Sequence, residues 1–362
     1  MIDLIYDCDI TMGLPDRDVD DGLALLHLLG CPEIRLLGIT STFGNSSIRE
    51  VHPCLLSILE DLGRCDIPAY PGASREAVAA AASRNPSPGR GEARSDSKAA
   101  RFLAETAGGS PGKVSILATG SPTNLLGAFR LYPGFFRDVK QIVFMGGITE
   151  PLMINGRMMG ELNFASDPEA ALYALYAGLP PDSAGDTGLP GQPSGSVSRE
   201  AERCPITVIS GNLCLQALLS REHFSAFVEQ ARAKVSRGYI TYLQEKIYPW
   251  FSWIEGAYAL PGFHAWDATA AVYLTDPQLF DSREVVLAST LDDLRTGYLR
   301  IDGTCEATGD TPANAGSRST GNPIFGDSNP WRINLPTRIR DLPGYWRSLF
   351  RGWEEAGTSW PQ

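Results

Sequence analysis

The sequence predicts an α/β protein with a mostly parallel open sheet and helices on both of its faces. Short apolar runs alternate with helical patterns along the chain, and this alternation requires crossover connections between parallel strands. The runs are brief and end in polar turns, as expected of strands that helices cover on both faces. In such sheets the ligand crevice lies beyond the carboxyl ends of the strands.

The first part of the chain contains two strand–helix units. A strand is expected at 4–6, and the next helix begins at Asp20, where an acidic first turn suits the helix dipole. Gly30 is placed to end that helix. A second strand is expected at 34–40, followed by a helix that Gly63 ends.

Three further strands are expected at 114–118, 141–145 and 205–210. The segment 120–124 opens a helix after the first of them. The segment 167–169 opens another, with a proline in the first helical turn.

We expect a single domain over residues 1–362. Two stretches rich in Ala, Gly, Pro and Ser interrupt the pattern at 76–112 and 180–204, and a Gly-rich stretch covers 303–322. Their composition is typical of mobile surface insertions and, in the third case, of a long loop.

The composition excludes several classes of function. The chain has 31 Lys and Arg against 42 Asp and Glu, a net charge of −11. This balance argues against binding a nucleic-acid backbone and against a polybasic membrane anchor. The N-terminus lacks a signal-peptide pattern, and no run reaches the roughly 18 apolar residues that span a bilayer. We expect a soluble, cytoplasmic protein with no nucleic-acid or membrane partner.

Acidic residues gather between the first strand and its helix. Like charges at this density repel one another unless a cation neutralises them, and a hard divalent cation with oxygen ligands is the simplest solution. A solvated acidic loop is the alternative. The residues are Asp7, Asp9, Asp16, Asp18, Asp20 and Asp21.

The segment 4–11 also matches the haloacid-dehalogenase-like phosphatase pattern, a strand followed by DxDx[TV]. In that family the first Asp attacks phosphorus and the second acts as acid and base, beside a bound magnesium ion. Here those residues would be Asp7 and Asp9. The terminal acidic motif of the family has only Gly309-Asp310 to match it, with no strand before it.

A second resemblance covers most of the chain. The inosine-uridine-type nucleoside hydrolase signature DxDxGxDDxxAL resembles Asp7-Cys8-Asp9 joined to the segment 20–25, although ten residues (10–19) stand where the family commonly has three. Further blocks follow in the family's order. They are GITSTFGN at 38–45, AYPGA at 69–73, ATGSPTNL at 118–125, VFMGG at 143–147, ELN at 161–163 with DPEAA at 167–171, and WDA at 266–268 with AAV at 270–272.

This resemblance implies a Rossmann-like core, one Ca²⁺ per subunit and hydrolysis of the N-glycosidic bond of ribonucleosides. Carried over by position, Asp9, Asp21, the backbone carbonyl of Thr123 and Asp267 would hold the metal. Asp9 would take the proton of a calcium-bound water that attacks the ribose. Asp7 would support the metal ligands from behind.

The resemblance also implies a substrate-binding set. Asp20, Asn45, Asn155, Glu161 and Asn163 would bind the ribose hydroxyls, Met145 would line the sugar pocket, and Trp266 would contact the base. It further suggests a homodimer or homotetramer that acts in nucleoside salvage.

Trp266 stands where many family members have a His, and His264 lies two residues earlier. A Trp at this place resembles the purine-preferring branch, in which indoles sandwich the base. We therefore favour purine or modified-purine nucleosides, with Phe251, Trp253 and Tyr258 as candidates for the second wall, and leave pyrimidine activity open. A catalytically inactive relative that binds a nucleoside or sugar is the non-enzymatic alternative.

Overall fold

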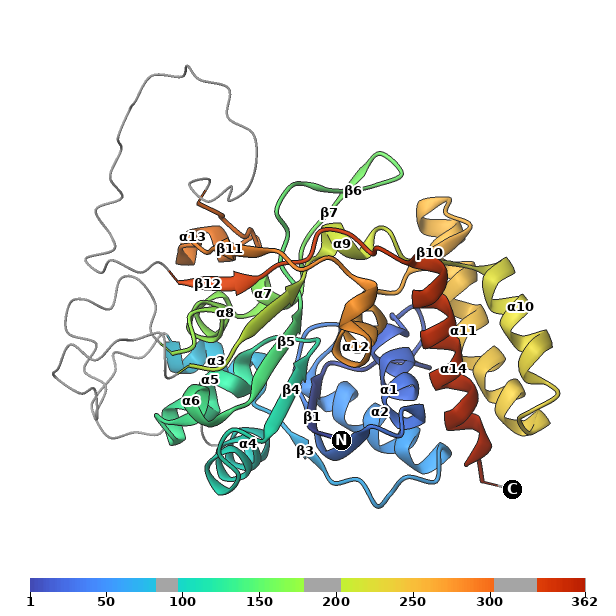
Figure 1. Cartoon of the computed structure of the whole chain (residues 1–362), viewed down its shortest axis with the longest axis horizontal. Helices are drawn as coiled ribbons and strands as arrows, with labels where there is room; N and C mark the ends of the chain where they lie inside the picture. Colours follow the sequence, from blue (N-terminus) through green and yellow to red (C-terminus); the bar gives the residue numbers. More distant parts are fainter. Residues whose placement is uncertain (83–96, 179–202, 303–330, 362) are drawn as a thin grey trace, which may run out of the picture.

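The computed structural model describes residues 1–82, 97–178, 203–302 and 331–361 (Figure 1). Eight strands form one sheet, in the order β11-β12-β8-β5-β4-β1-β2-β3. The neighbours pair in parallel, except for β11 and β12, which are antiparallel. The strands are β1 (Ile2–Cys8), β2 (Ile34–Ser41), β3 (Ala69–Pro71), β4 (Val114–Ala118), β5 (Gln141–Met145), β8 (Ile206–Ile209), β11 (Glu284–Val286) and β12 (Arg332–Asn334).

Helices cover both faces of this sheet, which confirms the predicted fold class. Alternate residues of β1 contribute to two separate cores: Leu4 and Tyr6 belong to one and Ile5 to the other. The first core lies beneath α1 (Asp20–Gly30), α2 (Ile48–Asp61), α10 (Arg221–Ala231), α11 (Arg237–Tyr258), α12 (Trp266–Thr275) and α14 (Leu342–Thr358). The second lies beneath α4 (Lys98–Gly109), α5 (Thr123–Leu131), α6 (Phe135–Asp138) and α8 (Pro168–Leu175).

Short elements complete the described chain. Two antiparallel pairs lie outside the main sheet, β6 (Leu152–Ile154) with β7 (Arg157–Met159) and β9 (Leu218–Ser220) with β10 (Gly262–His264). The remaining helices are α3 (Arg75–Ala82), α7 (Asn163–Ser166), α9 (Gly211–Cys214), α13 (Leu291–Leu294) and the 3₁₀ turn Pro277–Leu279.

Part of the predicted insertion at 76–112 is wrong. α4 lies within it and is a core helix: Ala99, Ala100 and Leu103 are fully buried. Small alanine side chains pack closely against the sheet but give little apolar periodicity in the sequence. The segment 83–96, nearly all of 180–204 and the whole of 303–322 lie outside the described residues.

Gly30 is the last residue of α1, as predicted, but for a different reason. A Cβ at Gly30 would lie 1.8 Å from the carbonyl oxygen of Gly352 in α14. The two helices therefore pack in backbone contact here, and any side chain would push them apart. Among the described helices, none is both long and apolar enough to cross a membrane.

Candidate active site

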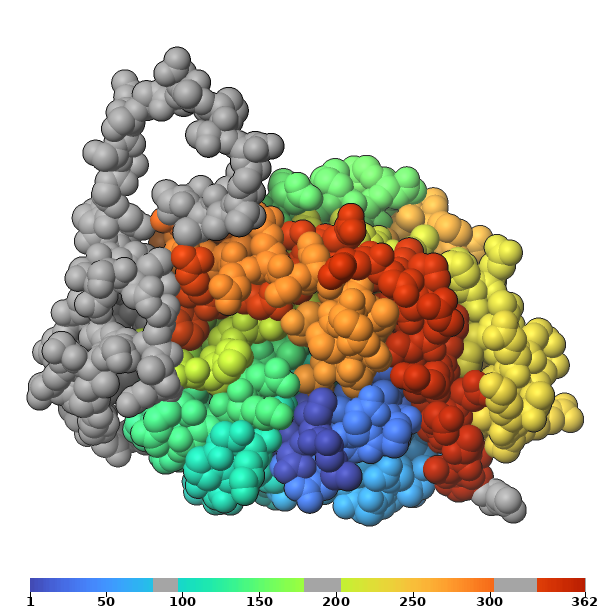
Figure 2. All heavy atoms as spheres, in the orientation of Figure 1, coloured from blue at the N-terminus to red at the C-terminus, as the bar shows by residue number. Residues whose placement is uncertain are grey.

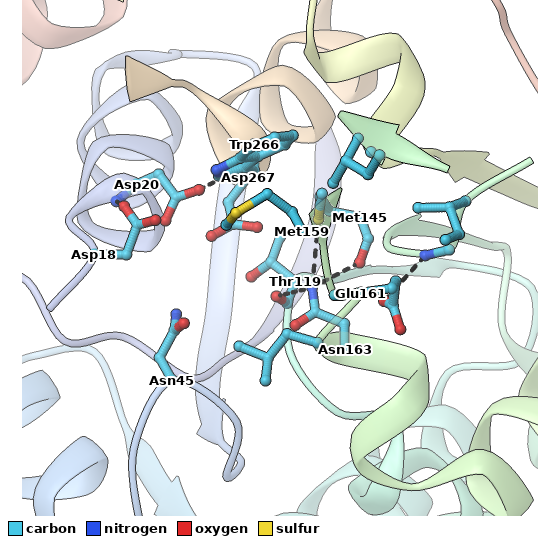
Figure 3. Close-up of a pocket in the computed structure, with 16 residues that line it drawn as sticks. Asp18, Asp20, Asn45, Thr119, Met145, Met159, Glu161, Asn163, Trp266 and Asp267 are labelled. Carbon is cyan, nitrogen blue, oxygen red and sulfur yellow. Dashed lines mark hydrogen bonds between the residues drawn. The ribbon is translucent and has the colours of Figure 1, made fainter. Parts of the chain in front are cut away.

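A cavity of about 300 Å³ lies at the carboxyl edge of the sheet (Figure 3), at the lower end of the usual size of small-molecule sites. Its walls come from the loops after β2 and β4, the end of β5, the hairpin β6–β7 and the starts of α1, α7 and α12. The lining residues are Asp18, Asp20, Asn45, Thr119, Met145, Gly147, Ile148, Leu152, Met159, Gly160, Glu161, Leu162, Asn163, Gly211, Trp266 and Asp267.

Four buried aspartates form what we call the carboxylate floor: Asp9, Asp20, Asp21 and Asp267. Oxygen atoms of Asp20, Asp21 and Asp267 lie within 4.8 Å of one another. Asp9 is linked to this group by Asn45, whose side-chain nitrogen lies 3.4 Å from a carboxylate oxygen of Asp9 and 3.4 Å from one of Asp21. The structure thus brings together aspartates that are up to 258 residues apart in the sequence.

The fold explains this convergence. Asp9 follows β1 directly, while Asp20 and Asp267 stand at or near the first residues of α1 and α12. The backbone N–H of Asp267 donates to Asp20 at 3.2 Å. Helix N-termini carry partial positive charge, so both positions favour carboxylates.

Hydrogen bonds from buried groups orient the carboxylates of the floor. Thr119 donates its hydroxyl to Asp21 at 2.7 Å, and the phenol of Tyr6 donates to the same oxygen at 3.1 Å. The backbone N–H of Asn45 donates to Asp9. These buried contacts fix the direction of the carboxylates before any ligand binds.

Ionisation of the four carboxyl groups of the floor is unfavourable in the absence of a cation. Burial raises the pKa of Asp9 to about 7 and that of Asp20 to about 6, and the charges of neighbouring aspartates add to both shifts. Burial and neighbouring carboxylates also raise the pKa of Asp21 and Asp267 well above the usual range. Among the described residues that line the cavity, none is Lys, Arg or His.

A divalent cation fits this donor set. The clustered ligand atoms are all oxygen, which hard cations such as Ca²⁺ and Mg²⁺ prefer. A bound cation would also reverse the pKa shifts, because its charge favours ionised carboxylates.

Four residues predicted at or near the metal are not among the lining residues: Asp9 and Asp21, which belong to the buried floor, and Asp7 and Thr123. Asp7 is fully buried behind the floor and accepts hydrogen bonds from Thr40 at 2.5 Å and Asn124 at 2.7 Å. This position fits a supporting role and leaves no access for an attack on phosphorus. Thr123 opens α5 and donates its hydroxyl to Asp167 at 2.8 Å. A metal contact through the Thr123 carbonyl stays a prediction.

Opposite the floor, Asn163 and Glu161 are held by backbone groups. The side-chain nitrogen of Asn163 donates to the carbonyls of Thr119 at 2.8 Å and Met145 at 3.0 Å. Glu161 accepts backbone N–H groups from Gly147 and from the first turn of α7 at 2.8–3.1 Å. Both side chains line the cavity with Met145. Their contact with the ribose stays a prediction.

Asn155 is placed differently from its prediction. It lies outside the cavity lining, at the exposed tip of the hairpin β6–β7, with φ 46° followed by Gly156 at φ 76°. Asn-Gly is the preferred pair for a two-residue hairpin turn, because both positions need a positive φ. Asn155 therefore forms the turn of the hairpin, which the Asn-Gly pair indicated in the sequence, and its contact with the ribose stays a prediction.

The predicted second aromatic wall is not part of the described lining. Trp253 stacks on Trp250 with ring centroids 4.7 Å apart, Phe251 is buried in the core, and Tyr258 packs near Trp253. Trp266 is thus the single aromatic residue among the described lining residues. His264 lies 5.1 Å from the Trp266 ring, and burial lowers its pKa to about 4.

Asp18 and Met159 are among the lining residues that the sequence did not assign to the site. Asp18 was counted only within the acidic run, but the lengthened loop folds it against the cavity, where its carboxylate accepts the backbone N–H of Val19 at 2.7 Å. Met159 comes from β7, a strand of three residues, which is too short to show periodicity.

A family model described as inosine-uridine preferring nucleoside hydrolase matches residues 4–317. Uridine nucleosidase 1 of Arabidopsis thaliana is 28% identical over 302 residues, which cover 79% of this chain and 80% of the relative. A pyrimidine-specific ribonucleoside hydrolase, RihA of Citrobacter koseri, is 32% identical over 193 residues, 50% of this chain and 59% of that one.

Solved structures share the fold. A plant nucleoside hydrolase, the PpNRh1 enzyme, superposes with a TM-score of 0.68 at 19% identity, covering 97% of this chain and 98% of that one. A purine-preferring ribonucleoside hydrolase from Gardnerella vaginalis gives 0.68 at 20% identity, covering 98% and 99%.

Proposed function

Because the chain belongs to the inosine-uridine preferring nucleoside hydrolase family, we propose that it is a calcium-dependent enzyme that cleaves ribonucleosides into free base and ribose. One observation carries the proposal: Asp20 and Asp267 of the buried carboxylate floor line a cavity of about 300 Å³, and none of its described lining residues is Lys, Arg or His. The family match also removes the phosphatase hypothesis.

In this proposal Asp9, Asp21, Asp267 and the carbonyl of Thr123 hold the cation. When bound, the cation supplies charge compensation and Lewis-acid activation of water. Asp9 accepts the proton of the attacking water, because a cation on the floor keeps its carboxylate ionised and next to the activated water.

The remaining polar lining holds the ribose. Asp20 and Asn45 lie on one side of the cavity and Asn163 and Glu161 on the other, so a sugar ring between them meets acceptors and amide groups on both sides. Cleavage of a glycosidic bond passes through an oxocarbenium-like state in which the ring flattens. Contacts that tighten on flattening lower the barrier rather than only the KM.

For the base, we propose a pyrimidine, with uridine as the first substrate. The second aromatic wall that favoured purines is not among the described lining residues, and the relatives above are named as a uridine nucleosidase and a pyrimidine-specific hydrolase. The cavity's single indole and aliphatic surface suit a small ring. Inosine is the matched comparison, because a structural neighbour is named purine-preferring.

The test is ribose release from uridine, cytidine, inosine, adenosine and guanosine, with EDTA and after restoring Ca²⁺ or Mg²⁺. We expect uridine cleavage that EDTA abolishes and Ca²⁺ restores. Ribose release that persists in EDTA would contradict the metal assignment, and faster release from inosine would contradict the base assignment. Tight nucleoside binding without turnover would favour the inactive relative.

A further inference from the structure

The hairpin β6–β7 is inserted between the end of β5 and α7, and it reaches over the cavity. Its strands pair Leu152 with Met159, Met153 with Met158, and Ile154 with Arg157. In Figure 2 this segment stands at the upper rim of the molecule. The pairing gives the hairpin two distinct faces, because side chains alternate along a strand.

The inner face points into the cavity and the outer face into solvent. Leu152 and Met159 form one cross-strand pair and both line the cavity. Met153 and Met158 form the next pair and are 48% and 75% exposed. Figure 3 shows the side chain of Met159 among Trp266, Asp267 and Met145. Chemically identical side chains thus stand next to each other in β7, one inside and one outside.

Tip contacts hold the inner face in place. The side chain of Asn155 donates to the carbonyl of Tyr258 at 2.8 Å, and Arg157 donates to the carbonyl of Ala257. The guanidinium of Arg157 also lies 5.9 Å from the centre of the Tyr258 ring. The hairpin is therefore fastened to the last turn of α11 and spans the opening.

The cavity lining combines polar and apolar side chains. The aspartates, Asn45, Glu161 and Asn163 offer partners to ribose hydroxyls. The apolar side chains of the lining are Met145, Ile148, Leu152, Met159, Leu162 and Trp266. Three of them, Leu152, Met159 and Leu162, belong to the hairpin or follow it.

We propose that Met159 packs against the base of the bound nucleoside and that the hairpin β6–β7 sets the base preference. The inference rests on the proposed function, since it needs a nucleoside with its ribose at the carboxylate floor. A thioether makes favourable contacts with aromatic rings and adapts its shape. The flexible side chain of Met159 then packs against the base in place of the second aromatic side chain that the sequence predicted.

The experiment compares Met159→Ala with Met158→Ala, its neighbour on the outer face. KM for uridine and inosine is measured for each variant, and calorimetry measures the Kd of uridine and of free ribose with Asp9→Asn added to each protein, so that uridine is not cleaved during the titration. We expect Met159→Ala to raise the uridine KM and Kd about three- to tenfold, the range of a sulfur–aromatic contact. The ribose Kd and all values for Met158→Ala should stay at the wild-type level.

Arg157→Ala, which loosens the tip without touching the cavity, should give a smaller rise in the uridine KM. Equal effects of the two methionine variants, or no effect of Met159→Ala, would overturn the proposal. An equal loss of ribose and uridine affinity would overturn it too, because it would indicate general disturbance of the cavity. If the wild-type protein cleaves no nucleoside, the proposed function fails, while the two Kd values still decide whether Met159 contacts the base.

Discussion

The carboxylate floor and the hairpin β6–β7 are built in different ways. In the carboxylate floor, every side chain is buried, and Asp9, Asp20 and Asp21 accept hydrogen bonds, as Asp21 does from Thr119 and Tyr6. The hairpin β6–β7 above it is an insertion fastened by exposed contacts at its tip. The floor is rigid enough to fix the chemistry, whereas the hairpin can change in sequence without disturbing it. We infer that reaction type and base preference are set by separate parts of the molecule.

The largest effect is expected at the floor. Asp9→Asn removes the proposed proton acceptor and one negative charge, so kcat should fall about 10²–10⁴-fold, the usual contribution of a general base. Asp16→Asn is the matched control: Asp16 is exposed on the same loop at φ 56°, a conformation that Asn tolerates. Ribose release with saturating uridine measures both. A wild-type kcat in Asp9→Asn would contradict the role of Asp9 as proton acceptor.

The second effect concerns stability and pH. Without metal, the pKa of Asp9 is about 7 and that of Asp20 about 6, both above the value of 3.8 for an ordinary aspartate. A raised folded-state pKa means that the folded state binds protons more tightly than the unfolded chain. The stabilisation from these protons is complete below about pH 4 and is lost as the pH rises through 6 and 7.

Metal-free protein should therefore lose thermal stability between pH 5 and pH 8 through these groups, and the stabilisation by added Ca²⁺ should grow over the same interval. Melting temperatures in EDTA and in Ca²⁺ at both pH values measure this. A Ca²⁺ effect that is larger at pH 5 than at pH 8 would contradict the electrostatic description of the floor.

A smaller effect is expected at Trp266. Trp266→Ala removes the one aromatic side chain among the described lining residues. The KM for uridine should therefore rise about tenfold, near the upper range of an aromatic contact. Trp253→Ala, which removes an indole stacked outside the cavity, should leave KM unchanged. A loss of kcat with an unchanged KM in Trp266→Ala would assign the indole to the leaving group instead of to binding.

The smallest effect is expected at the hairpin tip. Asn155→Asp keeps a residue that tolerates the left-handed conformation but loses the amide that donates to Tyr258. We expect less than about a threefold rise in KM, the scale of one exposed hydrogen bond. A rise in KM of a hundredfold or more would support the ribose contact that the resemblance implied for Asn155.

The sequence predicted that the aspartates of the floor lie close together, because the sheet topology places them at one edge. Parallel strands end at one edge, so polar residues after β1 and β4 and at the start of α1 must lie near one another. The predicted strands at 114–118 and 141–145 coincide with β4 and β5. Asp267 lies far away in the sequence, and only the family motif indicated its place.

The hairpin could not be predicted in the same way. β6 and β7 have three residues each, too few for a periodic pattern, and the position of the hairpin depends on contacts with α11, about a hundred residues later. The resemblance assigned Asn155 to the ribose, so its turn role with Gly156 was overlooked. Neighbouring side chains in so short a strand are assigned to the inner or outer face only by the tertiary structure.

The central claim is that a cation on the carboxylate floor enables the reaction. The most direct measurement is a calorimetric titration of EDTA-treated protein with Ca²⁺, with uridine cleavage followed in the same samples. We predict one tightly bound ion per chain, activity that returns with the same midpoint, and loss of both in Asp21→Asn. Full activity before any Ca²⁺ is added, or binding that leaves the cleavage rate unchanged, would contradict the account.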